Sequence, residues 1–173
     1  MLKTYDLDIL GLKIIEPNLF HDDRGLFFES YNKKSFNEEI ANVKFIQDNE
    51  SYSKYGVLRG LHYQEDPYAQ NKLVRVVKGE IQDVAVDLRK NSDTYMKHAS
   101  VILSSNNKRQ LFIPKGFAHG FLVLSDYAIV NYKVDNFYYP KSAKTILYSC
   151  KDLNIKWMLR NKDIILSKKD GKQ

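Results

Sequence analysis

The second half of the chain is a succession of short apolar or alternating segments separated by turn residues, and this pattern limits the fold more than any other feature. Residues 72–77 are mostly apolar, Lys78-Gly79-Glu80 is a turn signal, and residues 81–88 alternate, so a β-hairpin is expected here. Many short strands with almost no helix are typical of a β-sandwich or barrel. Further strands are expected over 99–103, 110–114, 119–124, 128–134 and 145–148.

The first third of the chain continues this pattern with one interruption. Ser35-Phe36-Asn37-Glu38 has the spacing of a capping box, which predicts a short helix over roughly 33–41. The Asp and Gly residues of 21–25 predict a turn. We therefore expect an all-β protein with a few short helices. Its early strands are expected over 7–10, 12–15, 26–30, 45–51 and 56–64.

Length and charge limit the kind of protein this can be. A chain of 173 residues with a hydrophobic fraction of 43% can form one domain with a packed core, and no linker or internal repeat divides it. We expect residues 1–173 to be a single domain. The net charge of +6 favours an anionic partner. Apart from a lysine-rich tail the basic residues are dispersed, so a small phosphate-bearing ligand is favoured over nucleic acid or a membrane surface.

Cysteine usage and the N-terminal sequence bear on the compartment. Cys150 is the only cysteine, so an intrachain disulfide and a CxxC metal site are excluded and a reducing compartment is expected. The N-terminus carries charge too early for a signal peptide, and no apolar run approaches the length of a membrane span. The sequence therefore predicts a cytoplasmic location and no membrane partner.

The segment over 56–64 carries residues that could do chemistry. Arg59 supplies a cation and His62 a titratable imidazole, and Gly60 between them permits close approach of another backbone. Only histidine has an unperturbed pKa near neutrality, so His62 could take and return a proton at working pH. A histidine that is hydrogen-bonded in the core is the ordinary alternative. The following cation Lys72 favours a positively lined pocket.

Two segments resemble the motifs of the cupin jelly rolls. Residues 114–121 have the P-x-G-x-x-H spacing that ends at His119, and Gly56 precedes His62 as in the first motif. The first motif usually continues as H-x-H, but the second position here is Gln64. A metal-binding cupin usually needs three histidines and a carboxylate. The resemblance therefore implies a cupin barrel without its metal site.

Acid–base chemistry without a metal needs a second proton carrier and a group that orients the imidazole. Tyr132, on the strand expected over 128–134, can supply a proton, although it is one of 12 tyrosines and could be structural. Asp170 is a candidate to hold the histidine tautomer, although an aspartate in a tail is usually solvated. Residue chemistry alone leaves both alternatives open.

Several longer blocks together resemble the dTDP-4-dehydrorhamnose 3,5-epimerases, a family of sugar-nucleotide epimerases in the cupin superfamily. The resemblance runs from about residue 12 to 170 and implies a cupin-type jelly-roll β-barrel or sandwich. Any one block is weak by itself, whereas together they are highly specific. They are 23–29 (DRGLFFE), 56–62 (GVLRGLH), 72–80 (KLVRVVKGE), 83–89 (DVAVDLR) and 114–121 (PKGFAHGF).

The resemblance implies catalytic roles for four residues. His62 matches the family's general base, Tyr132 its general acid, and Asp170, in an L-S-x-x-D motif, the carboxylate partner of the base. Lys72 matches a residue near the ketone oxygen. A ketone at C4 acidifies the hydrogens on C3 and C5, because the carbanion delocalises into an enolate. The resemblance therefore implies inversion by proton transfer, with no metal, nicotinamide or other cofactor.

The resemblance also implies a binding site for a nucleotide-diphosphate sugar. Arg24 and Arg59 match residues that grip the pyrophosphate, since arginine forks suit phosphate oxygens. Tyr138 matches the aromatic residue that stacks on the base. The other matched binding residues are Glu29, Gln47, Asn49, His119 and Lys169.

The implied substrate is dTDP-4-dehydro-6-deoxy-D-glucose, and the implied product is dTDP-4-dehydro-L-rhamnose. The implied assembly is a homodimer, with the strands of residues 1–20 in the interface and the tail over 151–173 closing over the site. Departures from the family pattern at Ala143 and Tyr148-Ser149 leave the nucleotide and the exact sugar open. The chain also ends three residues after Asp170, which leaves open how firmly that carboxylate is held.

Three alternatives remain. An epimerase could invert only C3 or only C5, or could act on a GDP- or CDP-linked 4-keto hexose or heptose. A metal-dependent cupin would need stoichiometric bound iron or zinc. A non-catalytic sugar-nucleotide binding module would be unaffected by loss of His62.

Overall fold

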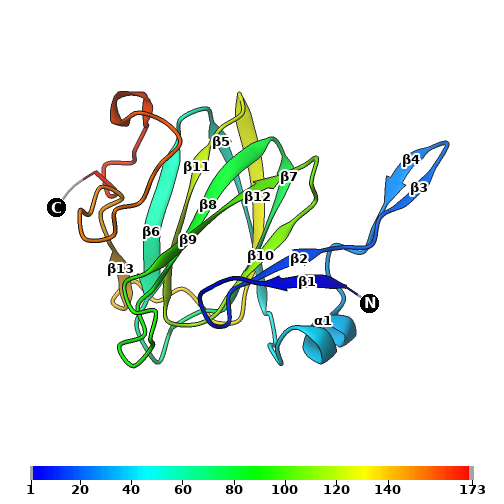
Figure 1. The fold of residues 1–173 in the computed structure, drawn as a ribbon, viewed down its shortest axis with the longest axis horizontal. Helices are drawn as coiled ribbons and strands as arrows, with labels where there is room; N and C mark the ends of the chain where they lie inside the picture. Colours follow the sequence, from blue (N-terminus) through cyan, green and yellow to red (C-terminus); the bar gives the residue numbers. More distant parts are fainter. Residues whose placement is uncertain (1, 172–173) are drawn as a thin grey trace.

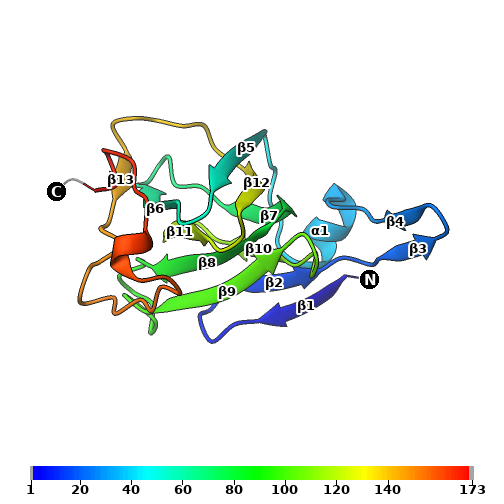
Figure 2. The same ribbon diagram turned by 90° about the horizontal axis from the view of Figure 1, so that it is seen from above.

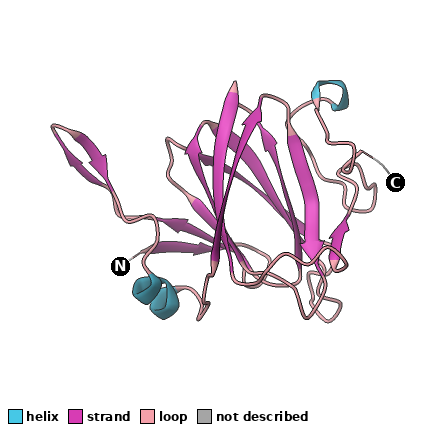
Figure 3. Cartoon of the chain, turned by 180° about the vertical axis from the view of Figure 1, so that it is seen from behind, coloured by secondary structure: helices cyan, strands magenta, loops and turns pink. Residues whose placement is uncertain are grey.

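The computed structural model describes residues 2–171, so Met1 and the last two residues of the expected tail, 172–173, lie outside the described part of the chain. Within that part, the strands form a six-stranded antiparallel sheet, a five-stranded antiparallel sheet and a separate hairpin (Figure 1). Strands dominate the molecule, and the short helical segments lie at its periphery (Figure 3). The expectation of an all-β protein with a few short helices is confirmed.

The strand order in each sheet is that of two layers joined by crossovers. The six-stranded sheet runs β1 (Lys3–Asp6), β2 (Lys13–Glu16), β10 (Gln110–Ile113), β7 (Lys72–Lys78), β12 (Tyr127–Val134), β5 (Gln47–Lys54). The five-stranded sheet runs β13 (Ala143–Thr145), β6 (Leu58–Gln64), β11 (Phe117–Val123), β8 (Glu80–Asp87), β9 (His98–Ser104). The remaining elements are the hairpin of β3 (Phe20–Asp22) and β4 (Gly25–Phe27), helix α1 (Lys33–Glu39) and the 3-10 turn η1 (Asn161–Asp163).

The main core lies between the two sheets. On β8, Ile81 and Ala85 belong to this core together with Val74 and Val130 of the other sheet. The intervening β8 residues, such as Val84, pack in a second cluster that includes residues of the C-terminal segment. Burial of apolar surface contributes about 25 cal/mol per Å², and here both faces of the five-stranded sheet gain from it. The alternation therefore marks which residues face which layer.

The first expected strand is wrong in position. Residues 7–10 form a turn, and the chain's first strand, β1, precedes them. The backbone N–H of Leu7 donates to the carbonyl of Leu12 (3.2 Å), and that of Leu12 donates to the carbonyl of Ile9 (3.1 Å). The apolar side chains of Ile9 and Leu12 are thus buried by a chain reversal. Strand β1 is exposed, so hydrophobicity did not reveal it.

The expected helix is present as α1, but its N-cap is wrong in the sequence interpretation. The Asn32 side-chain oxygen accepts from the backbone N–H of Lys34 (3.0 Å) and of Ser35 (3.2 Å). These are the N–H groups that a helix N-terminus leaves unpaired, so Asn32 begins the helix and Ser35 lies inside it. The strand expected over 26–30 is also shorter, because β4 ends at Phe27.

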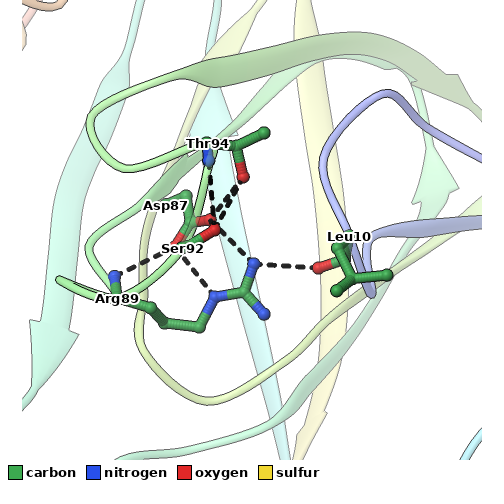
Figure 4. A network of polar contacts seen from close by, with 5 residues as sticks. All are labelled: Leu10, Asp87, Arg89, Ser92 and Thr94. Carbon is green, nitrogen blue, oxygen red and sulfur yellow. Dashed lines mark hydrogen bonds and ion pairs between the residues drawn. The ribbon is translucent and has the colours of Figure 1, made fainter.

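A buried carboxylate fixes the N-terminal turn to the end of β8 (Figure 4). The Asp87 carboxylate accepts from the Arg89 guanidinium (2.7 Å) and from the hydroxyls of Ser92 (2.6 Å) and Thr94 (2.7 Å). The guanidinium also donates to the carbonyl of Leu10 (2.9 Å). Burial by itself would raise the pKa of Asp87, but these hydrogen bonds hold it well below the usual range. The carboxylate therefore stays ionised and paired.

The hairpin of β3 and β4 projects away from the two sheets, on the side of the molecule where α1 lies (Figure 2). Three of its large apolar residues are exposed: Phe20, Leu26 and Phe27. No helix in residues 2–171 has the length and apolar character needed to cross a bilayer.

Candidate active site

A cavity of about 260 Å³ lies between the sheets, and it collects most of the residues that the sequence marked for chemistry. Its walls come from β5, β6, β7, β11, β12 and β13, from the loop before β13 and from the C-terminal segment. The expected site residues that line it are Arg59, His62, Lys72, His119, Tyr132, Tyr138 and Lys169. The other lining residues are Ser51, Tyr63, Gln64, Gln70, Phe121, Ala143 and Lys144.

His62 and Asp170 form a close pair although 108 residues separate them in the sequence. The His62 Nε2 lies 2.6 Å from the Asp170 Oδ1. The imidazole is 41% exposed, whereas the carboxylate is 4% exposed. The C-terminal segment reaches this position because the Leu58 N–H donates to the Ile165 carbonyl (2.9 Å) and the Ile165 N–H to the Gly56 carbonyl (2.8 Å). The pair therefore depends on docking of the tail beside β6.

The surroundings of His62 favour its neutral form. Burial lowers the pKa of His62 below its usual value, and the hydrogen bond and charge of Asp170 oppose this only in part. The positive charges of Lys72 and Lys169 lower the pKa further. When the Nε2–H donates to Asp170, the lone pair of the neutral ring lies on Nδ1. That nitrogen is then able to accept a proton from a ligand.

Lys72 supplies a buried cation close to this base. Its side chain is buried on β7, and its Nζ donates to the backbone carbonyl of His62 (3.4 Å). Burial lowers the pKa of Lys72 to about 8, and the carboxylate of Asp83 opposes that shift. Lys72 is therefore protonated at neutral pH and can face a developing oxyanion.

Tyr132 approaches the cavity from the other sheet. It lies on β12, whereas His62 lies on β6, so the two side chains enter from opposite walls. Burial raises the pKa of Tyr132, and the nearby charge of Arg59 only partly opposes this. The phenol therefore keeps its proton at neutral pH and can donate it.

A second histidine–carboxylate pair lies on the neighbouring strands. The His119 Nε2 is 2.6 Å from the Asp83 Oδ1, and both side chains are buried. Sequence reasoning named His119 but missed Asp83. The signal that could have found it is its position on β8. In the alternating pattern this charged residue lies on the same inward face as Ile81 and Ala85.

Arg59 is held at the cavity wall by β5. Its Nε donates to the Ser53 hydroxyl (3.0 Å), and its terminal nitrogen donates to the Tyr52 carbonyl (3.3 Å). The close approach expected at Gly60 is confirmed, because a Cβ there would lie 2.5 Å from the Cα of Gly120 on β11. These contacts leave a guanidinium beside the cavity with donors for an anionic group.

Five expected site residues do not line this cavity. Arg24 lies on the projecting hairpin, where its side chain is 90% exposed and pairs with Asp22 (2.6 Å). Glu29 lies in a smaller cavity beside α1. Gln47 and Asn49 lie on β5, on the same face as Ser51, and the Gln47 amide donates to the Asn49 side chain (2.7 Å). The fifth is Asp170, which lines a second cavity that His62 also borders.

The donor set around the cavity does not match a cupin metal centre. In residues 2–171, no three His, Cys, Asp or Glu side chains are grouped as metal ligands. His62 and His119 each face a carboxylate across 2.6 Å, and the amide of Gln64 is engaged with backbone groups.

Comparison with known proteins gives matches over nearly the full length of the chain. A profile described as dTDP-4-dehydrorhamnose 3,5-epimerase matches residues 6–173. The Shigella flexneri protein of that name is 54% identical over 171 residues, which cover 98% of this chain and 92% of the relative. The Bacillus anthracis 3,5-epimerase, solved with TDP and PPi bound, is similar with a TM-score of 0.95 at 47% identity, covering 98% of this chain and 97% of that one.

A Legionella pneumophila epimerase, solved in complex with dTDP-4-keto-L-rhamnose, gives a TM-score of 0.94 at 47% identity and covers 98% of this chain and 90% of its own. These likenesses confirm the jelly-roll fold class that the sequence predicts. The matched profile covers residues 6–173, and the identities extend over nearly the full length. The chain therefore belongs to the dTDP-4-dehydrorhamnose 3,5-epimerase family.

Proposed function

We propose that this chain inverts C3 and C5 of dTDP-4-dehydro-6-deoxy-D-glucose, giving dTDP-4-dehydro-L-rhamnose, and that it does so without a resident metal or organic cofactor. The observation that carries the proposal is that His62 and Tyr132 line one cavity from opposite sheets. Burial lowers the pKa of His62 and raises the pKa of Tyr132, which favours a base and an acid respectively. Removal of a proton from one face and its return to the other inverts a carbon centre. Membership of an epimerase family makes the chain an isomerase.

In the proposed reaction, His62 removes the proton at C3 or C5 through Nδ1, while Asp170 holds the other ring nitrogen. Electrons from the broken C–H bond move into the C4 ketone and form an enolate. The Lys72 ammonium faces the oxyanion, a type of interaction often worth about 3 kcal/mol. Tyr132 donates a proton to the opposite face, which leaves an imidazolium and a tyrosinate. His62 then releases its proton and Tyr132 takes one up by exchange with solvent, and repetition at the second carbon completes the double inversion.

The nucleotide portion is proposed to lie toward Tyr138 and Arg59. Arg59 offers guanidinium donors to the pyrophosphate, and His119 and Lys169 add positive or polar groups at the same cavity. We propose that the tail over 151–173 closes over the sugar, since its docked segment carries both Lys169 and Asp170.

We propose that the active form is a homodimer. Arg24 lies on the hairpin that projects away from its own sheets (Figure 2), so the pyrophosphate role implied for it requires that a second copy supply it. The exposed Phe20 and Phe27 on that hairpin favour burial against another surface. Sedimentation at micromolar concentration tests this, and a monomer that turns over at full rate would overturn it. A cytoplasmic location fits the lone Cys150 and is part of the proposal.

Incubation with dTDP-4-dehydro-6-deoxy-D-glucose in D2O tests the function, with products followed by NMR and mass spectrometry. We expect deuterium at both C3 and C5 and a product with both centres inverted. Deuterium at C3 or C5 alone would indicate an epimerase of one centre. Without exchange the proposed substrate is wrong, and the GDP- and CDP-linked ketosugars are the next substrates. Tyr132→Phe should lose inversion while part of the exchange remains.

A further inference from the structure

Two loops form one side of the cavity mouth, and side-chain amides tie them together. The first loop covers residues 65–71 and the second covers residues 135–142, between β12 and β13. The Gln70 amide donates to the carbonyl of Asn136 (2.7 Å), and the Asn136 amide donates back to the carbonyl of Pro67 (3.0 Å). Each loop is therefore held by the other rather than by a regular sheet ladder.

Gln64, the last residue of β6, makes the central connection between these loops. Its Nε2 donates to the carbonyl of Tyr68 (2.7 Å) in the first loop and of Phe137 (3.1 Å) in the second. Its Oε1 accepts from the backbone N–H of Tyr139 (2.7 Å). The rings of Tyr68 and Tyr139 stack with centroids 4.1 Å apart. The two partners in the second loop are the residues immediately before and after Tyr138.

Tyr138 lines the cavity but is 59% exposed, so the position of its ring depends strongly on its backbone. We propose that Gln64 is a positioning residue that sets how tightly the cavity holds a nucleotide base, because it fixes the backbone on both sides of Tyr138. This inference rests on the proposed function, in which Tyr138 stacks on that base. A ring that is already in its stacking position loses less entropy on binding.

The chemistry of the amide explains why glutamine is needed. Gln64 is 8% exposed and uses both a donor group and an acceptor group on backbone partners. Gln64→Glu keeps the shape but turns a carboxylate oxygen toward the carbonyl oxygens of Tyr68 and Phe137. Oxygens that face each other in this way repel, and buried groups that lose their partners are costly. The loops should then separate around Tyr138 while His62, Lys72 and Tyr132 keep their places.

Calorimetric titration of dTDP and of inorganic pyrophosphate into the wild-type and Gln64→Glu proteins tests the inference. We expect the Kd of dTDP to rise about tenfold, as the loss of one to two net hydrogen bonds predicts. Pyrophosphate lacks a base, so its Kd should change by less than about twofold. KM should rise while kcat is kept. An equal loss of affinity for both ligands, or an unchanged dTDP affinity, overturns the inference.

A double-mutant cycle with Tyr138→Ala separates positioning from a general effect on the fold. If Gln64 acts through Tyr138, Gln64→Glu should cause little further loss of dTDP affinity when the ring is absent. A full additional tenfold loss would contradict the inference. Gln64→Ala removes the same hydrogen bonds without adding a charge, and it serves as the test variant if Gln64→Glu does not fold.

Gln82→Glu is the matched control. Gln82 is a buried amide that donates to the Ser100 hydroxyl and the Lys156 carbonyl and accepts from the Met158 N–H, so the same substitution breaks the same kinds of hydrogen bond away from the mouth. It should lower the melting temperature, and any change in Kd should be the same for dTDP and for pyrophosphate.

A wild-type protein that binds dTDP but exchanges no C3 or C5 proton would overturn the proposed reaction and leave the inference about Gln64 standing.

Discussion

Two histidine–carboxylate pairs lie side by side in this molecule, and they are built in different ways. His62 and His119 are directly opposite each other on β6 and β11, and each Nε2 lies 2.6 Å from an aspartate oxygen. The partner of His119 is Asp83 on the adjacent strand β8, and both side chains are buried. The partner of His62 is Asp170 in the tail, and this imidazole is partly exposed to the cavity.

The first pair, His119 and Asp83, is positioned by the sheet, whereas the second, His62 and Asp170, forms only when the tail docks. Strand register places Asp83 opposite Phe121 and therefore diagonal to His119 whenever the five-stranded sheet forms. Asp170 arrives only when the chain near Ile165 docks against Gly56 and Leu58. Exchange of a proton with a ligand requires access to solvent or substrate. The His62 imidazole is 41% exposed, whereas His119 lines the same cavity but is only 7% exposed. Substitutions in the His62 pair should therefore lower mainly turnover, whereas substitutions in the His119 pair should lower mainly dTDP binding or stability.

Loss of the imidazole should show the largest contrast. We expect His62→Ala to reduce kcat by about a thousandfold, because general acid–base catalysis typically contributes a factor of about 10² to 10⁴. The Kd of dTDP should stay within about twofold. His119→Ala should instead weaken dTDP binding more than it lowers kcat. Steady-state kinetics measure kcat, and calorimetry measures the Kd of dTDP. Equal losses of kcat in the two variants would show that the two pairs do not differ in function.

Neutralising each carboxylate sharpens the contrast. Asp170→Asn should lower kcat by about 10- to 100-fold, because a residue that orients a functional histidine typically has an effect of this size. Asp83→Asn should lower the free energy of unfolding by about 2 kcal/mol, because it alters a fully buried hydrogen-bonded partner. Denaturant titration and turnover are measured on both variants. The reverse pattern, with Asp83→Asn stable and Asp170→Asn fully active, would contradict this assignment.

Displacement of the tail should affect one pair and leave the other. Gly56 has a φ of +76°, and a Cβ there would lie 2.4 Å from the carbonyl oxygen of Asp163. We expect Gly56→Ala to shift the tail and lower kcat about tenfold through loss of the Asp170 contact. Gly79→Ala is the control, since Gly79, in the turn between β7 and β8, has a similar φ of +84° and a Cβ there would meet the backbone carbonyl of Tyr127 on β12. It should cost stability while the folded protein keeps its kcat.

The pH dependence should show the smallest effect. His62 must be neutral to act as a base, and its lowered pKa places the acidic limb of kcat/KM below pH 6.5. Lys72 must be protonated, so activity should fall as the pH rises through about 8, the pKa to which burial lowers it. Because Asp83 raises the pKa of Lys72, Asp83→Asn should move this alkaline limb to lower pH. An alkaline limb near the ordinary lysine pKa of about 10.4 would show that Lys72 is not required as a cation.

Much of the fold could be predicted because its signals are local. Alternation and turn residues predicted the hairpin of β7 and β8 and the strands up to residue 134, which the structure confirms with small shifts at their ends. The last strand, expected over 145–148, is wrong in position, because β13 covers Ala143–Thr145. The errors lie where the side-chain pattern does not match the backbone geometry. Ile9 is apolar but is buried by a turn, and Ser35 has a capping motif but Asn32 already caps the helix.

The candidate site also contains residues that local sequence revealed and residues that only the fold could reveal. Local spacing singled out His62 and His119, because glycine-flanked histidines on apolar strands are visible in the sequence itself. Asp83 was missed because its meaning depends on which face of β8 points inward. Arg24 was expected at the pyrophosphate, but in a single copy of the chain it lies on a hairpin away from the cavity.

The sequence by itself therefore determined the all-β fold class and the family, and it singled out the candidate reactive groups. Those properties depend on residue type and on spacing over a few positions. The family resemblance implied that Asp170 partners His62, and the structure places the two side chains in contact across 108 residues. Only the tertiary structure showed that Gln64 contacts the loop on either side of Tyr138. Such contacts depend on the packing of distant segments and on which groups remain buried and paired, and no local pattern contains that information.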